Sequence, residues 1–249
     1  MRGSLIAVIV ILSASTSRAQ DPERQNPIVP VFHEPHHRQV FQHGPMRILD
    51  LQLPPGDISW FHSHESPVLY VTLSTSRTRT QNLGQDWGGG GAGRGGAGRG
   101  NAPAATPPTT PPAPRATSTT SYAQQPVTHR LQNMGDGLFR AMVVINETSG
   151  DEATSATDAG FASNPELTNK WFRAYRIVLE PGQKTEPHVH RAPVAVFQAT
   201  AGKALGAGAM TWEFNEPGQW AFFDAGDRHD VRNAGDGRVE LIEVEVRGR

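Results

Sequence analysis

One motif occurs twice in this chain, and it constrains the fold more than any other feature. Pro-Gly, five residues, His-x-His, two residues and Pro-Val run from Pro55 to Val68 and again, without a gap, from Pro181 to Val194. Each copy begins at a turn that follows a stretch typical of a β-strand. Two copies within 249 residues predict one fold that has been duplicated.

A second pair of segments extends the repeat downstream. His-x3-Asn-x-Gly-Asp-Gly runs from His129 to Gly137 and again from His229 to Gly237. Short alternating stretches separated by Gly and Pro turns fill the rest of both copies, as in antiparallel sandwiches and barrels. We find no pattern for a helix longer than one or two turns. The sequence therefore predicts an all-β protein.

The repeated histidines are the candidate site. Two histidines one residue apart on an extended segment point to the same side of it, because side chains alternate along a strand. Three imidazoles that converge from two strands are enough protein ligands for a first-row metal with an open position. Histidines that only hydrogen-bond inside a polar barrel are the alternative. The second copy offers His188, His190 and His229 as metal ligands, and the first copy offers His62, His64 and His129.

Both motifs resemble the two sequence motifs of the cupin superfamily, Gly-x5-His-x-His and a later Gly-x5-Pro-x-Gly-x2-His-x3-Asn. The second copy fits both, with Asp224 where the family usually has Pro, whereas the first copy keeps Pro126 and His129 with altered spacing. The resemblance implies a bicupin, in which two tandem jelly-roll β-barrels pack against each other. It also implies a metal or small-molecule pocket inside a barrel.

One departure from the family occurs in both copies. The family usually places a metal-binding Glu four residues after His-x-His, and this chain has Leu69 and Ala195 there. The resemblance then implies three-histidine sites for Fe, Mn, Ni, Cu or Zn, with a vacated position suited to an anionic substrate. Phe197, Ala195 and Asn233 are candidates for substrate contact, although Asn133 and Asn233 are more simply turn caps. By alternation, most of four strand carboxylates should lie on the surface: Glu213, Glu240, Glu243 and Glu245.

The chain divides into segments by composition. A basic start, an apolar run and small residues make 1–19 a predicted signal peptide, so we expect a secreted or periplasmic protein. A Pro-rich lead-in covers 20–38, and its His33-Glu34-Pro35-His36-His37 tract is expected to be solvated. The first barrel is predicted at 39–147, with a disordered Gly/Pro-rich insert at about 85–120. A linker at 148–165 and a second barrel at 166–247 complete the chain.

Charge and composition narrow the partners. The net charge of −1 and the isoelectric point near 6.8 give no indication of a nucleic-acid partner, and no segment after the signal peptide is apolar enough for a membrane. We expect a monomer or homodimer that takes a small-molecule ligand. The hypotheses that remain are a metal-dependent enzyme of dioxygenase, decarboxylase, lyase or isomerase type, and a secreted cupin that binds a sugar, organic acid or metal without turnover.

Overall fold

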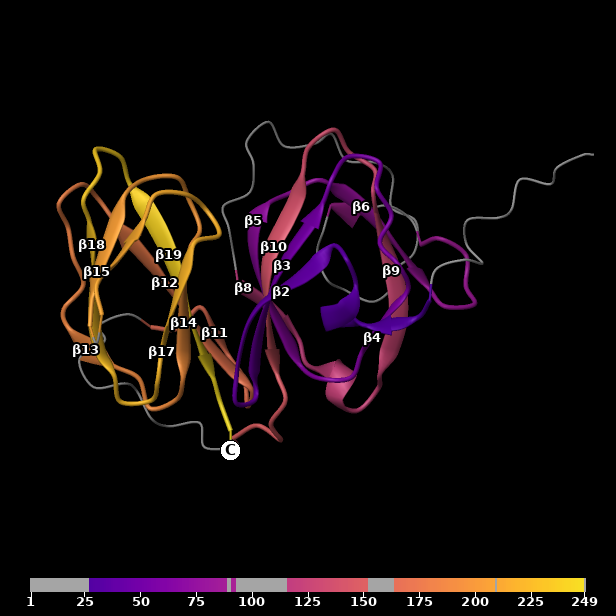
Figure 1. The fold of residues 1–249 in the computed structure, drawn as a ribbon, viewed down its shortest axis with the longest axis horizontal. Coiled ribbons are helices and arrows are strands. Elements are labelled where there is room, and N and C mark those ends of the chain that lie inside the picture. Colours follow the sequence, from indigo (N-terminus) through magenta and orange to yellow (C-terminus); the bar gives the residue numbers. More distant parts are fainter. Residues whose placement is uncertain (1–26, 89–90, 93–115, 152–163, 209, 249) are drawn as a thin grey trace, which may run out of the picture.

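The computed structural model describes residues 27–88, 91–92, 116–151, 164–208 and 210–248. The predicted signal peptide, most of the predicted insert and most of the predicted linker lie outside these residues. Two β-barrels stand side by side (Figure 1). In the described residues the only helices are two single 3-10 turns, η2 (Val31–His33) and η3 (Ser121–Ala123). No helix there is long and apolar enough to cross a membrane.

The first barrel is a sandwich of two five-stranded sheets. One sheet has the order β1-β4-β9-β6-β7, and the other has the order β2-β3-β10-β5-β8. The strands of the first sheet are β1 (Val29–Pro30), β4 (His62–His64), β9 (Val127–Asn133), β6 (Arg77–Asn82) and β7 (Gly91–Ala92). Those of the second sheet are β2 (His37–His43), β3 (Met46–Leu53), β10 (Phe139–Asn146), β5 (Val68–Ser74) and β8 (Ala116–Thr119).

The second barrel repeats this plan with a five-stranded and a four-stranded sheet. The orders are β11-β12-β19-β14-β17 and β13-β18-β15-β16. The strands of the larger sheet are β11 (Leu167–Thr168), β12 (Phe172–Leu179), β19 (Val239–Val246), β14 (Val194–Gln198) and β17 (Trp220–Phe223). Those of the smaller sheet are β13 (His188–Val189), β18 (Arg228–Asn233), β15 (Ala204–Ala207) and β16 (Trp212–Phe214).

Alternation along the central strands builds two kinds of core. On β10, Met142 and Val144 point out of the barrel, whereas Ala141, Val143 and Ile145 point into it. Outward-facing residues of the β2-β3-β10-β5-β8 sheet and of the β11-β12-β19-β14-β17 sheet form one shared apolar cluster. The two barrels therefore pack against each other through these two sheets. The inner faces of the two barrels form two further, separate clusters.

The turn after each downstream motif is built in the same way in both barrels. The Asn133 amide donates to the carbonyls of Leu53 (2.8 Å) and Gly137 (2.7 Å). Asn233 donates to the carbonyls of Leu179 (2.9 Å) and Gly237 (2.8 Å). Both asparagines are completely buried. The expected turn caps are confirmed, and the internal repeat extends to side-chain hydrogen bonds.

Two expectations about the first barrel are wrong. The lead-in is not solvated at its end, because Glu34 and His37 are each only 1% exposed. Strand β2 already starts at His37, and β1 and η2 pack on the same barrel. The insert does not extend to residue 120 either, since β8 pairs with β5 from Ala116 onward. Polar composition concealed both segments, because their burial depends on partners far away in the sequence.

Candidate metal centre

The second barrel brings its three motif histidines together by strand pairing. His188 on β13 lies directly opposite His229 on β18 in the antiparallel register, and His190 follows on the same face of the chain. The ring centroids are 4.4 Å apart for His188–His229, 5.1 Å for His188–His190 and 5.3 Å for His190–His229. All three are 1% exposed. The structure therefore brings the three predicted histidines together.

A carboxylate that sequence reasoning did not single out completes the cluster. Glu243 on β19 places Oε2 3.1 Å from His188 Nε2 and 2.9 Å from His190 Nε2, and Oε1 3.5 Å from His229 Nε2. The four side chains offer ligand atoms that all lie within 4.8 Å of one another. The expectation of a purely neutral three-histidine site in this barrel is thus wrong, because the carboxylate comes from a different strand.

Register explains why Glu243 was missed. Val196 on β14 pairs with Glu243, and Val194 pairs with Glu245, so these four side chains share the inner face. Glu240, Glu243 and Glu245 are all buried, contrary to the surface expectation, and only Glu213 is exposed. Alternation places residues 243 and 245 on the same face of the strand, but it does not determine whether that face points into the barrel or into solvent. A buried strand with two inward carboxylates breaks the usual pattern.

The donor set fits a cation better than it fits a hydrogen-bonded pocket. His188 Nδ1 donates to the Glu186 carbonyl (2.9 Å), and His190 Nδ1 donates to Glu245 Oε1 (2.9 Å). Their Nε2 atoms are therefore left to point at the Glu243 carboxylate. Both ring nitrogens of His229 and Oε1 of Glu243 are buried without a hydrogen-bond partner. A shared cation would satisfy His229 Nε2 and Glu243 Oε1 at once.

Electrostatics favours an ionised Glu243. In the metal-free protein burial alone would raise the pKa of this carboxyl. Hydrogen bonds from His188 and His190, whose Nε2 atoms then carry protons in place of a metal ion, outweigh burial and hold the pKa well below its usual range. Glu245 supports the cluster from outside, where it also pairs with Arg173 at 3.4 Å. Phe223 stacks on His229 with ring centroids 4.1 Å apart. The result is an anionic donor set inside an apolar barrel.

The first barrel gathers its histidines in the same register. His62 pairs with His129, and the ring centroids are 4.8 Å apart for that pair, 5.1 Å for His62–His64 and 4.9 Å for His64–His129. These three histidines could also hold a metal ion. Burial is the main reason that the pKa of each is lowered, to about 4 for His129. Neutral imidazoles are the form that ligates metals.

A second pair of residues beside this cluster was not predicted. Glu34 and His37 lie next to His62, and together these three also form a group that could hold a metal ion. The Glu34 carboxylate accepts hydrogen bonds from His36 Nδ1 (3.0 Å), His37 Nδ1 (2.7 Å) and the backbone N–H of Trp60 (3.0 Å). Burial alone would raise the pKa of Glu34, but these bonds outweigh it and keep the pKa far below its usual range.

The predicted substrate residues lie elsewhere. Ala195 and Phe197, like Leu69, belong to the apolar cluster between the barrels, on the face opposite Glu243. A glutamate at Ala195 or Leu69 would point out of the barrel, so those positions do not report a lost ligand. The Asn233 amide is used by its turn. None of the three predicted positions belongs to the metal cluster.

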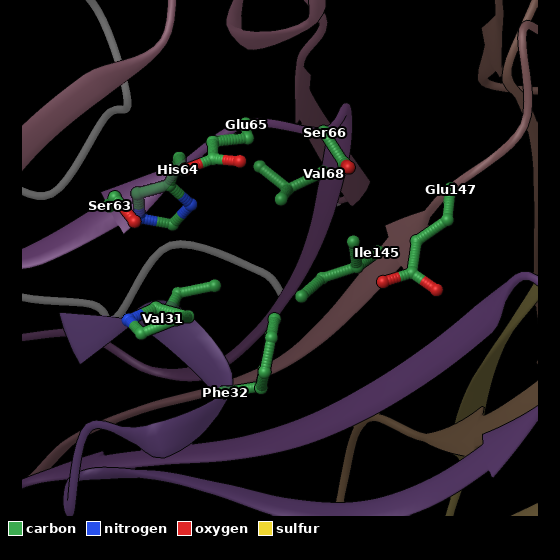
Figure 2. A pocket seen from close by; sticks show the side chains of 10 residues that line it. Val31, Phe32, Ser63, His64, Glu65, Ser66, Val68, Ile145 and Glu147 are labelled. Atoms are coloured by element: carbon green, nitrogen blue, oxygen red, sulfur yellow. The ribbon is translucent and has the colours of Figure 1, made fainter.

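A cavity opens beside the first cluster. It has a volume of about 220 Å³. Figure 2 shows His64 and Val68 on one side, Val31 and Phe32 from η2 on another, and Ile145 with Glu147 on a third. His64 therefore connects the buried histidine cluster of the first barrel to a space large enough for a small molecule. Among the four donors of the second barrel, none lines this cavity.

Comparisons with known proteins agree with this architecture. Residues 175–245 match the family model of the cupin domain. AerE from Microcystis aeruginosa is a similar solved structure, with a TM-score of 0.55 and 13% identity over 83% of this chain and 90% of that one. No curated protein gives a significant match. The family match and the fold support the cupin superfamily, and at this identity the structural likeness concerns the fold alone.

Two further solved structures give lower scores. A cupin 2 conserved barrel domain protein from Leptotrichia buccalis has a TM-score of 0.47 and 10% identity, and covers 84% of this chain and 87% of that one. Oxalate decarboxylase from Bacillus subtilis has a TM-score of 0.48 and 11% identity, and covers 82% of this chain and 68% of that one.

Proposed function

We propose that this protein is a metal-dependent bicupin whose second barrel holds a divalent transition-metal ion. The observation that carries the proposal is the convergence of His188, His190, His229 and Glu243, whose donor atoms all lie within 4.8 Å of one another. Fe, Mn, Ni, Cu and Zn all accept three imidazoles and a carboxylate. We further propose that the substrate is a small oxygenated organic molecule.

A bound divalent metal would polarise a carbonyl or carboxylate oxygen, or lower the pKa of a water molecule. The chain itself prepares the donors. The Glu186 carbonyl and Glu245 fix the tautomers of His188 and His190, which keeps both Nε2 atoms available. Apolar residues that fill the rest of the barrel, such as Val231 and Leu241, exclude water. This arrangement suits a reaction of dioxygenase, decarboxylase, lyase or isomerase type.

One observation favours a second candidate, a cupin that binds a metal or small molecule without turnover. Each of the four donors in the second barrel is at most 1% exposed, whereas catalytic metal sites keep an open position for substrate. A metal held there could stabilise the fold. Substrate turnover that depends on Glu243 would exclude this alternative.

Metal analysis of protein purified from its native compartment tests the proposal. We expect at least one equivalent of a transition metal per chain, and His188→Ala should lower the count by one. Val189→Ala, the intervening residue, is the matched control and should leave the count unchanged. Equal metal content in wild type and His188→Ala, with matching circular dichroism, would overturn the proposal. N-terminal sequencing of the exported protein tests the proposed signal peptide, with a start near Gln20 expected.

A further inference from the structure

The cavity of the first barrel is bordered on one side by an ion pair. Arg47 Nε donates to Glu147 Oε1 at 2.7 Å, and Glu147 lines the cavity. The Arg47 guanidinium also lies 4.4 Å from the ring centroid of Phe32, which is another lining residue. Its Nη1 donates to the side-chain oxygens of Gln39 and Gln42, at 3.1 and 2.8 Å. The guanidinium is therefore held in one place beside the cavity.

This ion pair keeps unused hydrogen-bonding capacity. Among the described residues, neither Arg47 Nη2 nor Glu147 Oε2 has a hydrogen-bond partner. The two side chains are 17% and 32% exposed, so a ligand can reach them from solvent. Arg47 offers N–H donors with a positive charge, and Glu147 offers an acceptor with a negative charge. The pair is thus complementary to a group that carries a carboxylate and an ammonium side by side.

The opposite side of the cavity holds a buried imidazole. His64 is 2% exposed and lines the cavity, and neither of its ring nitrogens has a hydrogen-bond partner among the described residues. Figure 2 shows Glu147 across the cavity from His64, and apolar Val68 and Ile145 lie between them. A neutral imidazole has one N–H that donates and one nitrogen that accepts. A ligand that extends from the ion pair to His64 therefore needs an apolar middle and a polar end.

Register shows how the second barrel differs at this place. Arg47 on β3 pairs with Ile145 on β10. At the corresponding position of the second barrel, Arg173 on β12 pairs with Glu245 on β19. Arg173 and Glu245 form an ion pair at 3.4 Å, and their side chains are only 7% and 2% exposed. Isoleucine in the first barrel offers no such partner, so the equivalent arginine pairs with Glu147 beside the cavity.

We propose that this cavity binds an α-amino acid whose side chain ends in a polar group. The Arg47–Glu147 pair binds the carboxylate and the ammonium of the ligand, its side chain lies over Val68 and Ile145, and the polar end bonds to His64. The cavity volume of about 220 Å³ equals that of roughly seven water molecules at about 30 Å³ each, which is enough for the side chain of glutamine. This inference deepens the proposed function, because it specifies the small oxygenated molecule, but it requires no metal ion.

Isothermal titration calorimetry on the full-length protein tests the inference, with L-glutamine as the probe. Two analogues each remove one charge: glutaramic acid lacks the ammonium, and 4-aminobutanamide lacks the carboxylate. L-Leucine keeps both charges, and its side chain of similar size ends in methyl groups. We expect saturable binding of L-glutamine and at least ~10-fold weaker binding of the other three, because each lacks one hydrogen-bonding group. Absence of L-glutamine binding, or equal binding of any of the other three, would overturn the inference.

Two substitutions separate the roles of the ion pair. Arg47→Met should weaken L-glutamine binding at least ~10-fold and leave 4-aminobutanamide unchanged, because that analogue has no carboxylate. Glu147→Gln should weaken L-glutamine to a similar degree and leave glutaramic acid unchanged. Arg38→Met is the matched control, since the Arg38 side chain is 70% exposed and pairs with Asp50. An L-glutamine affinity that neither variant changes would contradict the assignment. The metal count of the second barrel is measured on the same samples, so failure of this inference is distinguishable from failure of the proposed function.

Discussion

Substitution of Glu243 by valine is the sharpest test of the second-barrel centre, because Val143 occupies the corresponding position of the first barrel. Phe139 pairs with Leu53 as Val239 pairs with Leu179, which aligns strands β10 and β19. All donor atoms lie within 4.8 Å of one another. A doubly charged ion shared by them would therefore sit within about 4 Å of the carboxylate. At an effective dielectric constant of about 20, the attraction is roughly 8 kcal/mol for a dication at 4 Å. Desolvation of the two charges cancels several kcal/mol of this.

A net contribution of about 3–4 kcal/mol remains, which corresponds to a loss of roughly 10²- to 10³-fold in metal affinity for Glu243→Val. Competition against a chromophoric chelator measures this loss, and circular dichroism confirms the fold. Glu240→Gln is the control, because Glu240 is buried on the same strand but pairs with Arg176 and Arg238 outside the cluster. Equal affinities for Glu243→Val and Glu240→Gln would refute the assignment of the carboxylate.

Two further predictions follow from the same contacts. Glu245→Gln keeps the shape but weakens the hydrogen bond to His190 Nδ1, so metal affinity should fall by about 10- to 100-fold in chelator competition, and an unchanged affinity would contradict the role of Glu245. In the metal-free folded protein, burial lowers the pKa of His129 to about 4 from its ordinary value of 6.5. The contribution of neutral His129 to the free energy of unfolding is fully present above about pH 6.5. It is lost as the pH falls toward 4, because the unfolded chain takes up the proton first. This contribution amounts to about 3 kcal/mol of unfolding free energy. Urea unfolding at pH 6.5 and at pH 4 measures it, and an unfolding free energy that does not change between these pH values would contradict the burial argument.

The repeat was the part of the molecule that could be predicted best. Its spacing located the two His-x-His strands and their partners His129 and His229, because a metal-ligand pattern is local in sequence and is carried by strand alternation. Apolar and polar residues also alternate at 46–53 and 239–246, and these ranges coincide with strands β3 and β19. Apolar alternation is strong there, and both strands are central in their sheets.

What could not be predicted depends on contacts between distant strands. Glu243 lies 53 residues after His190, and Glu34 lies 28 residues before His62. Nothing in the local pattern of either glutamate distinguishes a buried carboxylate from a solvated one. Ala195 and Phe197 do lie on the same face of their strand, as predicted, but that face points toward the other barrel and not into a pocket. A strand packed on both sides gives no polar face from which to choose.

The duplicated fold therefore keeps its histidines and varies its carboxylates. In the second barrel Glu243 stands among the ring nitrogens, so a bound cation would be neutralised directly and sealed in an apolar interior. In the first barrel the corresponding residue is Val143, and the Glu34 carboxylate beside His62 accepts hydrogen bonds from His36 and His37. Direct ligation by a carboxylate strengthens the hold on a cation, whereas a neutral donor set leaves more positive charge to attract an anionic ligand. The argument for a substrate that carries a carboxylate thus applies to the first barrel.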